Sequence, residues 1–517
     1  MKQFLFFYFL SASVYAQHKT VSIVQYGAKA DAVTNNALFI QKAIDDVTAA
    51  GGGTVVIPAG VFVTGSIELK SGVELHLQKG AVLQGSVLRK DYENKIHPAL
   101  IVASAKQHFS ITGNGMIDGK GRELMKDIFK RLEEGTLIDK EWKTKRPTEG
   151  TRTNIFFFEY CANILVKGVT IKDATNWVTH YERCRNISID SIKIESMAYW
   201  NNDGIDMVDC KNVRITNCYI NTADDAICLK SAKEDDYCDS IYVSNCVLRS
   251  SANAFKLGTA SKGGFKNITV RNLVVYDTYR SAVALEAVDG GFIENVDVRN
   301  IAARNTGNAV FIKLGHRNND NRYSTVKNIY ISNVKVEVPA GKPDAAYEMQ
   351  GPLLRYPPTV KPADGKLISI SPWNYSYKDS AAIIYQHNVF PSSVSGLPGH
   401  AVENVKLENI EILYYTKADK KINYFPLDSF QLITEAEKDY PEFSMFGELP
   451  VWGFYIRHVS GLQMKNISVK MKGIDFRTAY LFNDVKDLYL QKVNSEGSTA
   501  KPQLFKHDVT EITNQKK

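Results

Sequence analysis

The sequence predicts an all-β chain wound as a single-stranded parallel β-helix, and the main evidence is a recurring short unit. Between residues 163 and 328 its copies are spaced 23 to 33 residues apart. Each copy alternates apolar and polar residues, the periodicity of a strand with one buried face. One copy is too short to fold alone, so stacked copies must bury a continuous core. The copies are CANILVKGVTI (161–171), CRNISIDSIKI (184–194), CKNVRITNCYI (210–220), CDSIYVSNCVL (238–248), FKNITVRNLVV (265–275), IENVDVRNIAA (293–303), VKNIYISNVKV (326–336), VENVKLENIEI (402–412) and LQMKNISVKMK (462–472).

A β-sandwich is the alternative all-β fold. It needs hairpin turns about every 8–12 residues, and the longer repeat of this chain argues against it. Asn recurs at matching turn positions, where it suits left-handed bends and side-chain ladders. Residues 339–400 and 415–450 lack the repeat. We therefore expect two long loop insertions there that form walls of a binding cleft.

Residues 17–86 differ from the repeat and are expected to cap its N-terminal end. Ala37, Ile40, Ile44 and Val47 fall at helical spacing and share one face, and a glycine run at 51–53 ends this helix. Short strands follow it. A helix followed by strands can cover the open end of a solenoid. We assign residues 17–517 to one β-helix domain.

Residues 1–16 have the features of a cleavable signal peptide. Lys2 gives a positive start, residues 4–10 are apolar, and residues 14–16 fit a small-x-small cleavage site before Gln17. An N-terminal core strand is the alternative. The sequence therefore predicts a secreted or periplasmic protein.

Composition excludes several classes of partner. The chain has 517 residues, of which 44% are hydrophobic and 23% charged, with a net charge of +7. This mild charge permits an anionic polymer, but no basic cluster is dense enough to predict nucleic-acid binding. After the leader no stretch is long and apolar enough to span a bilayer. We expect a monomer.

Seven cysteines occur, and their odd number leaves at least one unpaired. Most lie inside the repeats. We interpret them as small buried residues stacked between coils, and one or two disulfides are the alternative in an oxidising compartment. Their spacing does not suggest zinc, and we expect no cofactor and no metal.

Three carboxylates on two successive coils are the strongest functional signal. Asp203 lies in NNDGID (201–206), and Asp224 and Asp225 lie in TADDAICLKS (222–231). Each segment precedes a short apolar strand. Neighbouring strands lie ~4.8 Å apart, so these acids should come within a few ångströms of one another. Such a cluster is typical of general acid/base chemistry or of metal binding.

The chain resembles glycoside hydrolase family 28, the polygalacturonase family. The resemblance is carried by YGAKAD and AIDDVTAAGGGTVVIPAGVF near the N-terminus, by Asn201-Asn202-Asp203, and by Asp224-Asp225. It implies a right-handed, pectin lyase-like β-helix and hydrolysis with inversion. By resemblance, Asp224 is the general acid, whereas Asp203 and Asp225 hold and activate the water. Inversion needs the acid and the base about 6.5–9.5 Å apart, and a like-charged neighbour can raise the pKa of one carboxyl.

Two motifs depart from the family pattern. Asn253, in Ala252-Asn253-Ala254, stands where the family has His in Gly-His-Gly. Glu286, in Ala284-Leu285-Glu286, stands where the family has Lys in Arg-Ile-Lys. The family's Arg and Lys contact the galacturonate carboxylate, so their loss argues against unbranched polygalacturonate. We expect Asn253 and Glu286 to bind substrate.

Replacement cations and one aromatic side chain complete the predicted site. Lys256 and Lys313 alternate with inward-facing apolar residues, so both should point outward, and Lys230 has the same parity. We expect these lysines to bind an anionic sugar. The alternative is that they form a solvated ladder that balances the charge of Asp and Glu side chains. Trp200 precedes Asp203 and is expected to stack on a sugar, with Asn202 binding beside it.

The sequence thus predicts an exported glycoside hydrolase acting on a pectin-type or related acidic plant polysaccharide or oligosaccharide. A polysaccharide lyase that uses calcium is the nearest alternative. A non-catalytic glycan-binding β-helix is the other.

Overall fold

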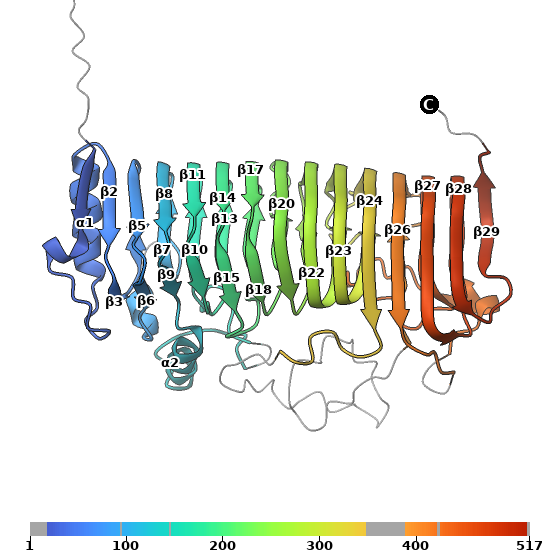
Figure 1. The fold of residues 1–517 in the computed structure, drawn as a ribbon, viewed down its shortest axis with the longest axis horizontal. Helices are drawn as coiled ribbons and strands as arrows, with labels where there is room; N and C mark the ends of the chain where they lie inside the picture. The colour runs from blue at the N-terminus through green and yellow to red at the C-terminus, as the bar shows by residue number, and fades with distance from the viewer. Residues whose placement is uncertain (1–17, 94–95, 144–145, 348–387, 421–423, 514–517) are drawn as a thin grey trace, which may run out of the picture.

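A computed structural model describes residues 18–93, 96–143, 146–347, 388–420 and 424–513. The predicted signal peptide and most of the predicted 339–400 insertion lie outside these residues. The described chain forms a right-handed parallel β-helix, which confirms the predicted fold class (Figure 1). No helix among these residues meets the length and apolarity that a membrane span requires.

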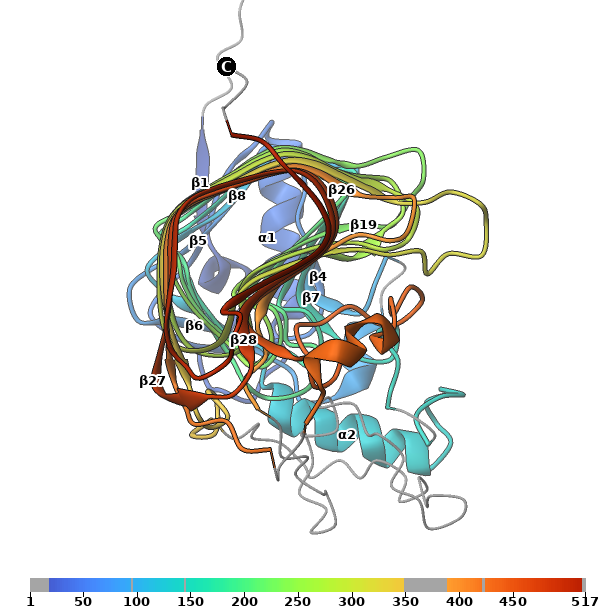
Figure 2. The same cartoon turned by 90° about the vertical axis from the view of Figure 1, so that its right-hand side faces the viewer.

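The strands stack in three columns, and each column is one face of the coil (Figure 2). The face that carries the acids comprises β4 (Ile67–Glu68), β7 (Ala99–Ser104), β10 (Asn154–Glu159), β13 (Thr179–Glu182), β16 (Ile205–Val208), β19 (Ile227–Ser231), β21 (Phe255–Ser261) and β25 (Ser392–Ser395). The second face comprises β1 (Lys19–Ser22), β2 (Gly53–Ile57), β5 (Val73–Leu77), β8 (Gln107–Gly113), β11 (Ala162–Lys167), β14 (Arg185–Asp190) and β17 (Lys211–Thr216). The third comprises β3 (Gly60–Thr64), β6 (Ala81–Gly85), β9 (Met116–Asp118), β12 (Thr170–Lys172), β15 (Lys193–Ser196) and β18 (Tyr219–Thr222).

Later strands run around the corners and span more than one face. They are β20 (Cys238–Ser250), β22 (Gly264–Ala287), β23 (Phe292–Leu314), β24 (Thr325–Pro339), β26 (Val402–Tyr415), β27 (Val451–Asp475), β28 (Thr478–Ser498) and β29 (Leu504–Glu511). Within each strand apolar residues alternate inward, as Val213 and Ile215 do in β17. The stacked coils therefore enclose one long apolar core.

Helices cover the end and one side of the coil. Helix α1 (Ala37–Ala49) buries Ile40, Ala43, Ile44 and Val47 against the first coils, as the helical spacing predicts. The other helices are η1 (Ile23–Tyr26), η2 (Arg89–Tyr92), α2 (Gly121–Glu133) and η5 (Leu427–Leu432). Helix α2 and the segment around η5 both lie on the side that carries the acids (Figure 2).

The seven cysteines are all buried free thiols, which agrees with the expectation of small buried residues stacked between coils. The thiol of Cys184 donates to the Phe158 carbonyl of the previous coil at 3.3 Å, and Cys210 does the same to Tyr181 at 3.3 Å. These thiols fill small spaces between coils and join them weakly.

Asn side chains form ladders along the outer corners, as predicted. In one ladder Asn300 Nδ2 donates to Asn272 Oδ1 at 2.9 Å, and Asn333 Nδ2 donates to Asn300 Oδ1 at 3.1 Å. All three residues have positive φ, which is 61° at Asn300. Asn tolerates this left-handed conformation better than most residues, so the same side chain allows the bend and links the coils.

Replacing Asn300 tests the ladder. Asn300→Ala should lower the free energy of unfolding by about 2 kcal/mol, since it adds left-handed strain and removes two hydrogen bonds. Asn300→Gly removes the same bonds without the strain and should lose about half as much. Urea unfolding followed by circular dichroism measures both. Equal losses in the two variants would show that the backbone conformation contributes nothing.

Candidate active site

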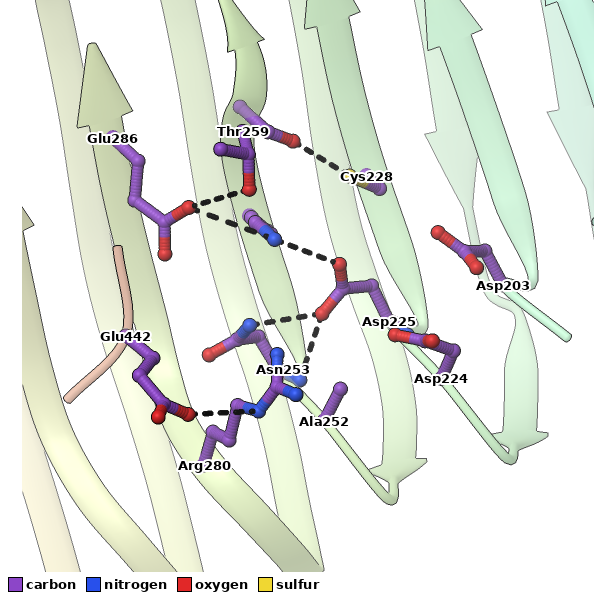
Figure 3. Close-up of polar contacts among 12 residues, drawn as sticks. Asp203, Asp224, Asp225, Cys228, Ala252, Asn253, Thr259, Arg280, Glu286 and Glu442 are labelled. Atoms are coloured by element: carbon purple, nitrogen blue, oxygen red, sulfur yellow. Dashed lines mark hydrogen bonds and ion pairs between the residues drawn. The ribbon is translucent and has the colours of Figure 1, made fainter. Parts of the chain in front are cut away.

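The three predicted acids come together at the start of neighbouring strands (Figure 3). Asp203 precedes β16, and Asp224 and Asp225 precede β19, whose residue Ile227 pairs with Ile205. Ligand atoms of Asp203, Asp225 and Cys228 all lie within 4.8 Å of one another. Asp203 and Asp225 are 3% exposed, whereas Asp224 is partly exposed.

Gly204 allows the two coils to approach at this point. A Cβ built on Gly204 would lie 2.5 Å from the carbonyl oxygen of Ala226, closer than any side chain tolerates. The Gly204 N–H donates to the Asp225 carbonyl at 2.9 Å. The residue after Asp203 must therefore be glycine if Asp203 is to lie against Asp225.

Asn202 supports the turn from inside. It is fully buried. Its Oδ1 accepts from Ser196 Oγ at 2.8 Å and from two backbone N–H groups, and its Nδ2 donates to the carbonyls of Ala174 and Asn176. The protein thus satisfies the whole amide, and substrate binding by Asn202 stays a prediction.

Asn253 holds Asp225 rather than facing the solvent. Its backbone N–H and its Nδ2 both donate to Asp225 Oδ1 at 2.9 Å, and it is 3% exposed. Lys256 Nζ lies 3.2 Å from Asp225 Oδ2. Burial opposes ionisation of Asp225, but Lys256, Lys230 and Arg280 outweigh it and lower its pKa to about 2. Asp225 is thus an anion at ordinary pH, and Asn253 holds it in place. Substrate contact by Asn253 stays a prediction.

Lys256 and Glu286 form a buried ion pair beside Asp225. Their charged atoms lie 3.5 Å apart, and Thr259 Oγ1 donates to Glu286 Oε2 at 3.2 Å. Both side chains are at most 2% exposed. Burial raises the pKa of Glu286 to about 7, although Lys256 opposes the rise. The outward parity of Lys256 is as predicted. The two residues bind each other under a cover, and their contact with substrate stays a prediction.

The cover is the segment 424–450, which is part of the insertion 415–450 that the sequence predicts as a wall of a binding cleft. Tyr440, which is 45% exposed, places its hydroxyl 3.3 Å from Lys256 Nζ. Glu442 Oε2 lies 3.7 Å from Arg280 Nε (Figure 3). Arg280, Tyr440 and Glu442 were missed by the sequence analysis. They belong to no motif, and only the tertiary structure brings them to the acids.

Lys313 lies under the same segment, and its contact with an anionic sugar stays a prediction. It is fully buried, its Nζ donates to the Glu435 carbonyl at 2.9 Å, and the Phe446 ring centre is 5.4 Å away. Burial lowers the pKa of Lys313 to about 8. Its parity is again as predicted, and its role here is to hold segment 424–450 on the coil.

Lys230 lies among the acids. Its Nζ is 2.9 Å from Asp203 Oδ2 and 2.6 Å from Asp206 Oδ1, and 3.0 Å from Cys228 Sγ. Lys230 thus contacts two carboxylates, and its contact with an anionic sugar stays a prediction. The spacing of Asp203, Asp225 and Cys228 would suit a metal ion, but the Lys230 ammonium already contacts two of them, Asp203 and Cys228. Asp206 was overlooked as a site residue although it stands in the same NNDGID segment.

Trp177, not Trp200, brings an aromatic ring to the acids. Trp200 is 9% exposed and packs in the main core, and its role as a sugar platform stays a prediction. Trp177 is partly exposed, and the Lys230 ammonium lies 4.4 Å from its ring centre. His180 lies 4.9 Å from the same ring and 3.5 Å from Glu182.

Burial and the Lys230 ammonium act on the pKa of Asp203 in opposite directions. Burial raises it well above the usual range, Lys230 opposes this rise, and Asp206 adds to it. Burial likewise raises the pKa of Asp206 to about 6. The main cause of both raised values is loss of water rather than a like-charged neighbour, and the assignment of the proton donor to Asp224 stays a prediction.

The chain is similar in sequence to proteins of one known family. The family model described as Glycosyl hydrolases family 28 matches residues 48–350. The exo-poly-alpha-D-galacturonosidase of Dickeya chrysanthemi is 28% identical over 251 residues, which are 40% of this chain and 41% of that protein. The match thus spans less than half the length of that relative.

Two solved structures share the fold. An exopolygalacturonase from Thermotoga maritima has a TM-score of 0.57 and 22% identity, over 77% of this chain and 89% of that one. The family 28 exopolygalacturonase from Yersinia enterocolitica has a TM-score of 0.59 and 16% identity, over 97% and 79%. Because the family model covers more than half of its residues, the chain belongs to glycosyl hydrolases family 28.

Proposed function

We propose that this protein is an exported glycoside hydrolase that cleaves pectin-type acidic polysaccharide with inversion at the anomeric carbon. The convergence of Asp203, Asp224 and Asp225 from two successive coils is the observation that carries the proposal. Membership of glycosyl hydrolases family 28 supports hydrolysis, and the galacturonan-cleaving relatives support a pectic substrate. The signal-like residues 1–16 support export.

The surroundings of each acid fit a division of roles. Asp224 is partly exposed and is the acid that a glycosidic oxygen can reach. Asp203 Oδ1 is buried and has no hydrogen-bond partner among the described residues, so it is an acceptor for a water molecule. Asp225 is fixed as an anion by Asn253 and Lys256.

The proposed reaction follows from these roles. Asp224 gives its proton to the glycosidic oxygen as the bond to the anomeric carbon breaks. A water held by Asp203 and Asp225 attacks that carbon from the opposite face and loses its proton to one of the two carboxylates. Proton transfer of this kind contributes about 10² to 10⁴-fold to a rate.

Asp224→Asn should reduce turnover by about 10² to 10⁴-fold while leaving the fold and substrate binding nearly intact, because only the transferable proton is lost. Initial rates on pectic oligosaccharides measure the change, and calorimetry measures binding. Asp190→Asn, which changes an acid on the second face, is the matched control. If Asp224→Asn keeps more than about half of the wild-type rate, Asp224 is not the acid. Proton NMR of fresh product should show the inverted anomer.

We expect activity to be independent of added metal. The ammonium of Lys230 already lies against Asp203 and Cys228, where a cation would bind. Activity should therefore survive dialysis against EDTA, and the product should show no ultraviolet absorbance from a double bond. Loss of activity in EDTA with recovery in calcium would support a lyase instead, and binding without any product would support a glycan-binding module.

Unbranched polygalacturonate should be a poor substrate. Lys230, Lys256 and Lys313 each bind protein oxygens, and Glu286 adds a carboxyl where the family has a cation. One missing charge-assisted contact lowers binding by about 1.5–3 kcal/mol, or one to two factors of ten. A panel that includes rhamnogalacturonan fragments measures kcat/KM for each glycan. Polygalacturonate as the best substrate of the panel would contradict this expectation.

A further inference from the structure

The ammonium of Lys230 lies at the centre of a group of acids that the proposed mechanism uses only in part. It contacts Asp203 Oδ2 at 2.9 Å and Asp206 Oδ1 at 2.6 Å, and the Trp177 ring lies on another side at 4.4 Å. The side chain of Asp206 is fully buried and that of Asp203 is 5% exposed. Two carboxylates shielded from water thus share one cation.

The immediate charge balance of this group is negative. Lys230 contributes one positive charge against the two acids that it touches, and Lys256 lies against Asp225 and Glu286 instead. The titratable groups that face the cluster come from four neighbouring coils. On the β13 coil they are His180 and Glu182, and on the β16 coil Asp203 and Asp206. On the β19 coil they are Asp224, Asp225 and Cys228, and on β21 Lys256.

We propose that Lys230 is a positioning residue that keeps Asp203 ionised and thereby sets the acidic limit of the pH range in which the water is activated. This inference rests on the proposed role of Asp203. This role of Lys230 differs from the binding of an anionic sugar that the sequence predicts.

Electrostatics gives the direction of the effect. Two buried carboxylates near each other raise each other's pKa unless a cation compensates both. Burial raises the pKa of both acids, and Lys230 is the main group that opposes the rise. Without the ammonium both pKa values rise further, so Asp203 holds its proton to higher pH. The acidic limb of the rate profile must then move to higher pH.

A structural role alone gives a different result. If Lys230 only joined two coils, its loss would lower stability and reduce the rate by the same factor at every pH. If it sets the charge of Asp203, the loss is large at low pH and smaller at high pH. The shape of the profile therefore separates the two roles.

The first experiment is the pH dependence of kcat/KM, from about pH 4 to about pH 9. Lys230→Met should move the acidic limb up by about one unit or more, which is a tenfold loss on that limb. Lys230→Arg keeps the charge and should keep the limb near its wild-type position. Lys211→Met, which removes a more exposed lysine paired with Asp236 at 2.8 Å, is the control and should leave the profile unchanged.

A charge-balanced variant keeps the test valid if Lys230→Met does not fold. Lys230→Met combined with Asp206→Asn removes the cation together with one of its two anions, so the limb should return toward the wild-type position. A limb that stays in place in Lys230→Met, with a uniform loss of rate, would overturn the inference. A double variant whose limb remains as high as in Lys230→Met would also overturn it.

A titration without substrate distinguishes this inference from the proposed function. With ¹³C-labelled aspartate, and with the Asp203 signal assigned through Asp203→Asn, NMR follows that carboxyl directly. A higher titration midpoint in Lys230→Met supports the inference even if no glycan is hydrolysed. A midpoint near the wild-type value in the double variant supports it as well. An unmoved midpoint in Lys230→Met overturns it even if the protein proves to be an active hydrolase.

Discussion

Backbone hydrogen bonding between successive coils is the constraint on which the rest of the structure depends. It holds parallel strands ~4.8 Å apart, so any two residues at equivalent positions of neighbouring coils are neighbours in space. The pairing of Ile205 with Ile227 fixes where the turns before β16 and β19 lie. Asp203 and Asp225 approach because of this register, and Gly204 removes the side chain that would keep the coils apart.

The same register stacks buried charges of both signs into a row. Lys230 lies against Asp203 and Asp206, and Lys256, one coil further on, lies against Asp225 and Glu286. Removing such charges from water costs several kcal/mol per ion, and their attraction repays this only when the geometry is good. The row is therefore better understood as a device that sets protonation states than as a source of stability. It yields one acid with a pKa of about 2 beside others with raised pKa values.

Sequence reasoning was reliable where the repeat determines position. The strand alternation, the Asn ladders, the capping helix and the convergence of the three acids all follow from periodicity. Parity also gave the outward direction of Lys256 and Lys313. It could not give their burial, because segment 424–450 has no repeat and its contacts are made only in the folded chain. The burial of Asn202 could not be predicted, because the direction of a side chain in a turn depends on local backbone angles, which no periodic pattern encodes.

The acids and the segment that covers their neighbours belong to different parts of the chain. The coils hold Asp203 and Asp224, whereas segment 424–450 touches Lys256, Arg280 and Lys313. A change in that segment can alter the charges beside Asp225 without moving the coils that hold the acids. The lysines that are expected to bind a sugar contact protein groups instead. The coils that hold the acids and the segment that covers their neighbours meet at the contact between Tyr440 and Lys256.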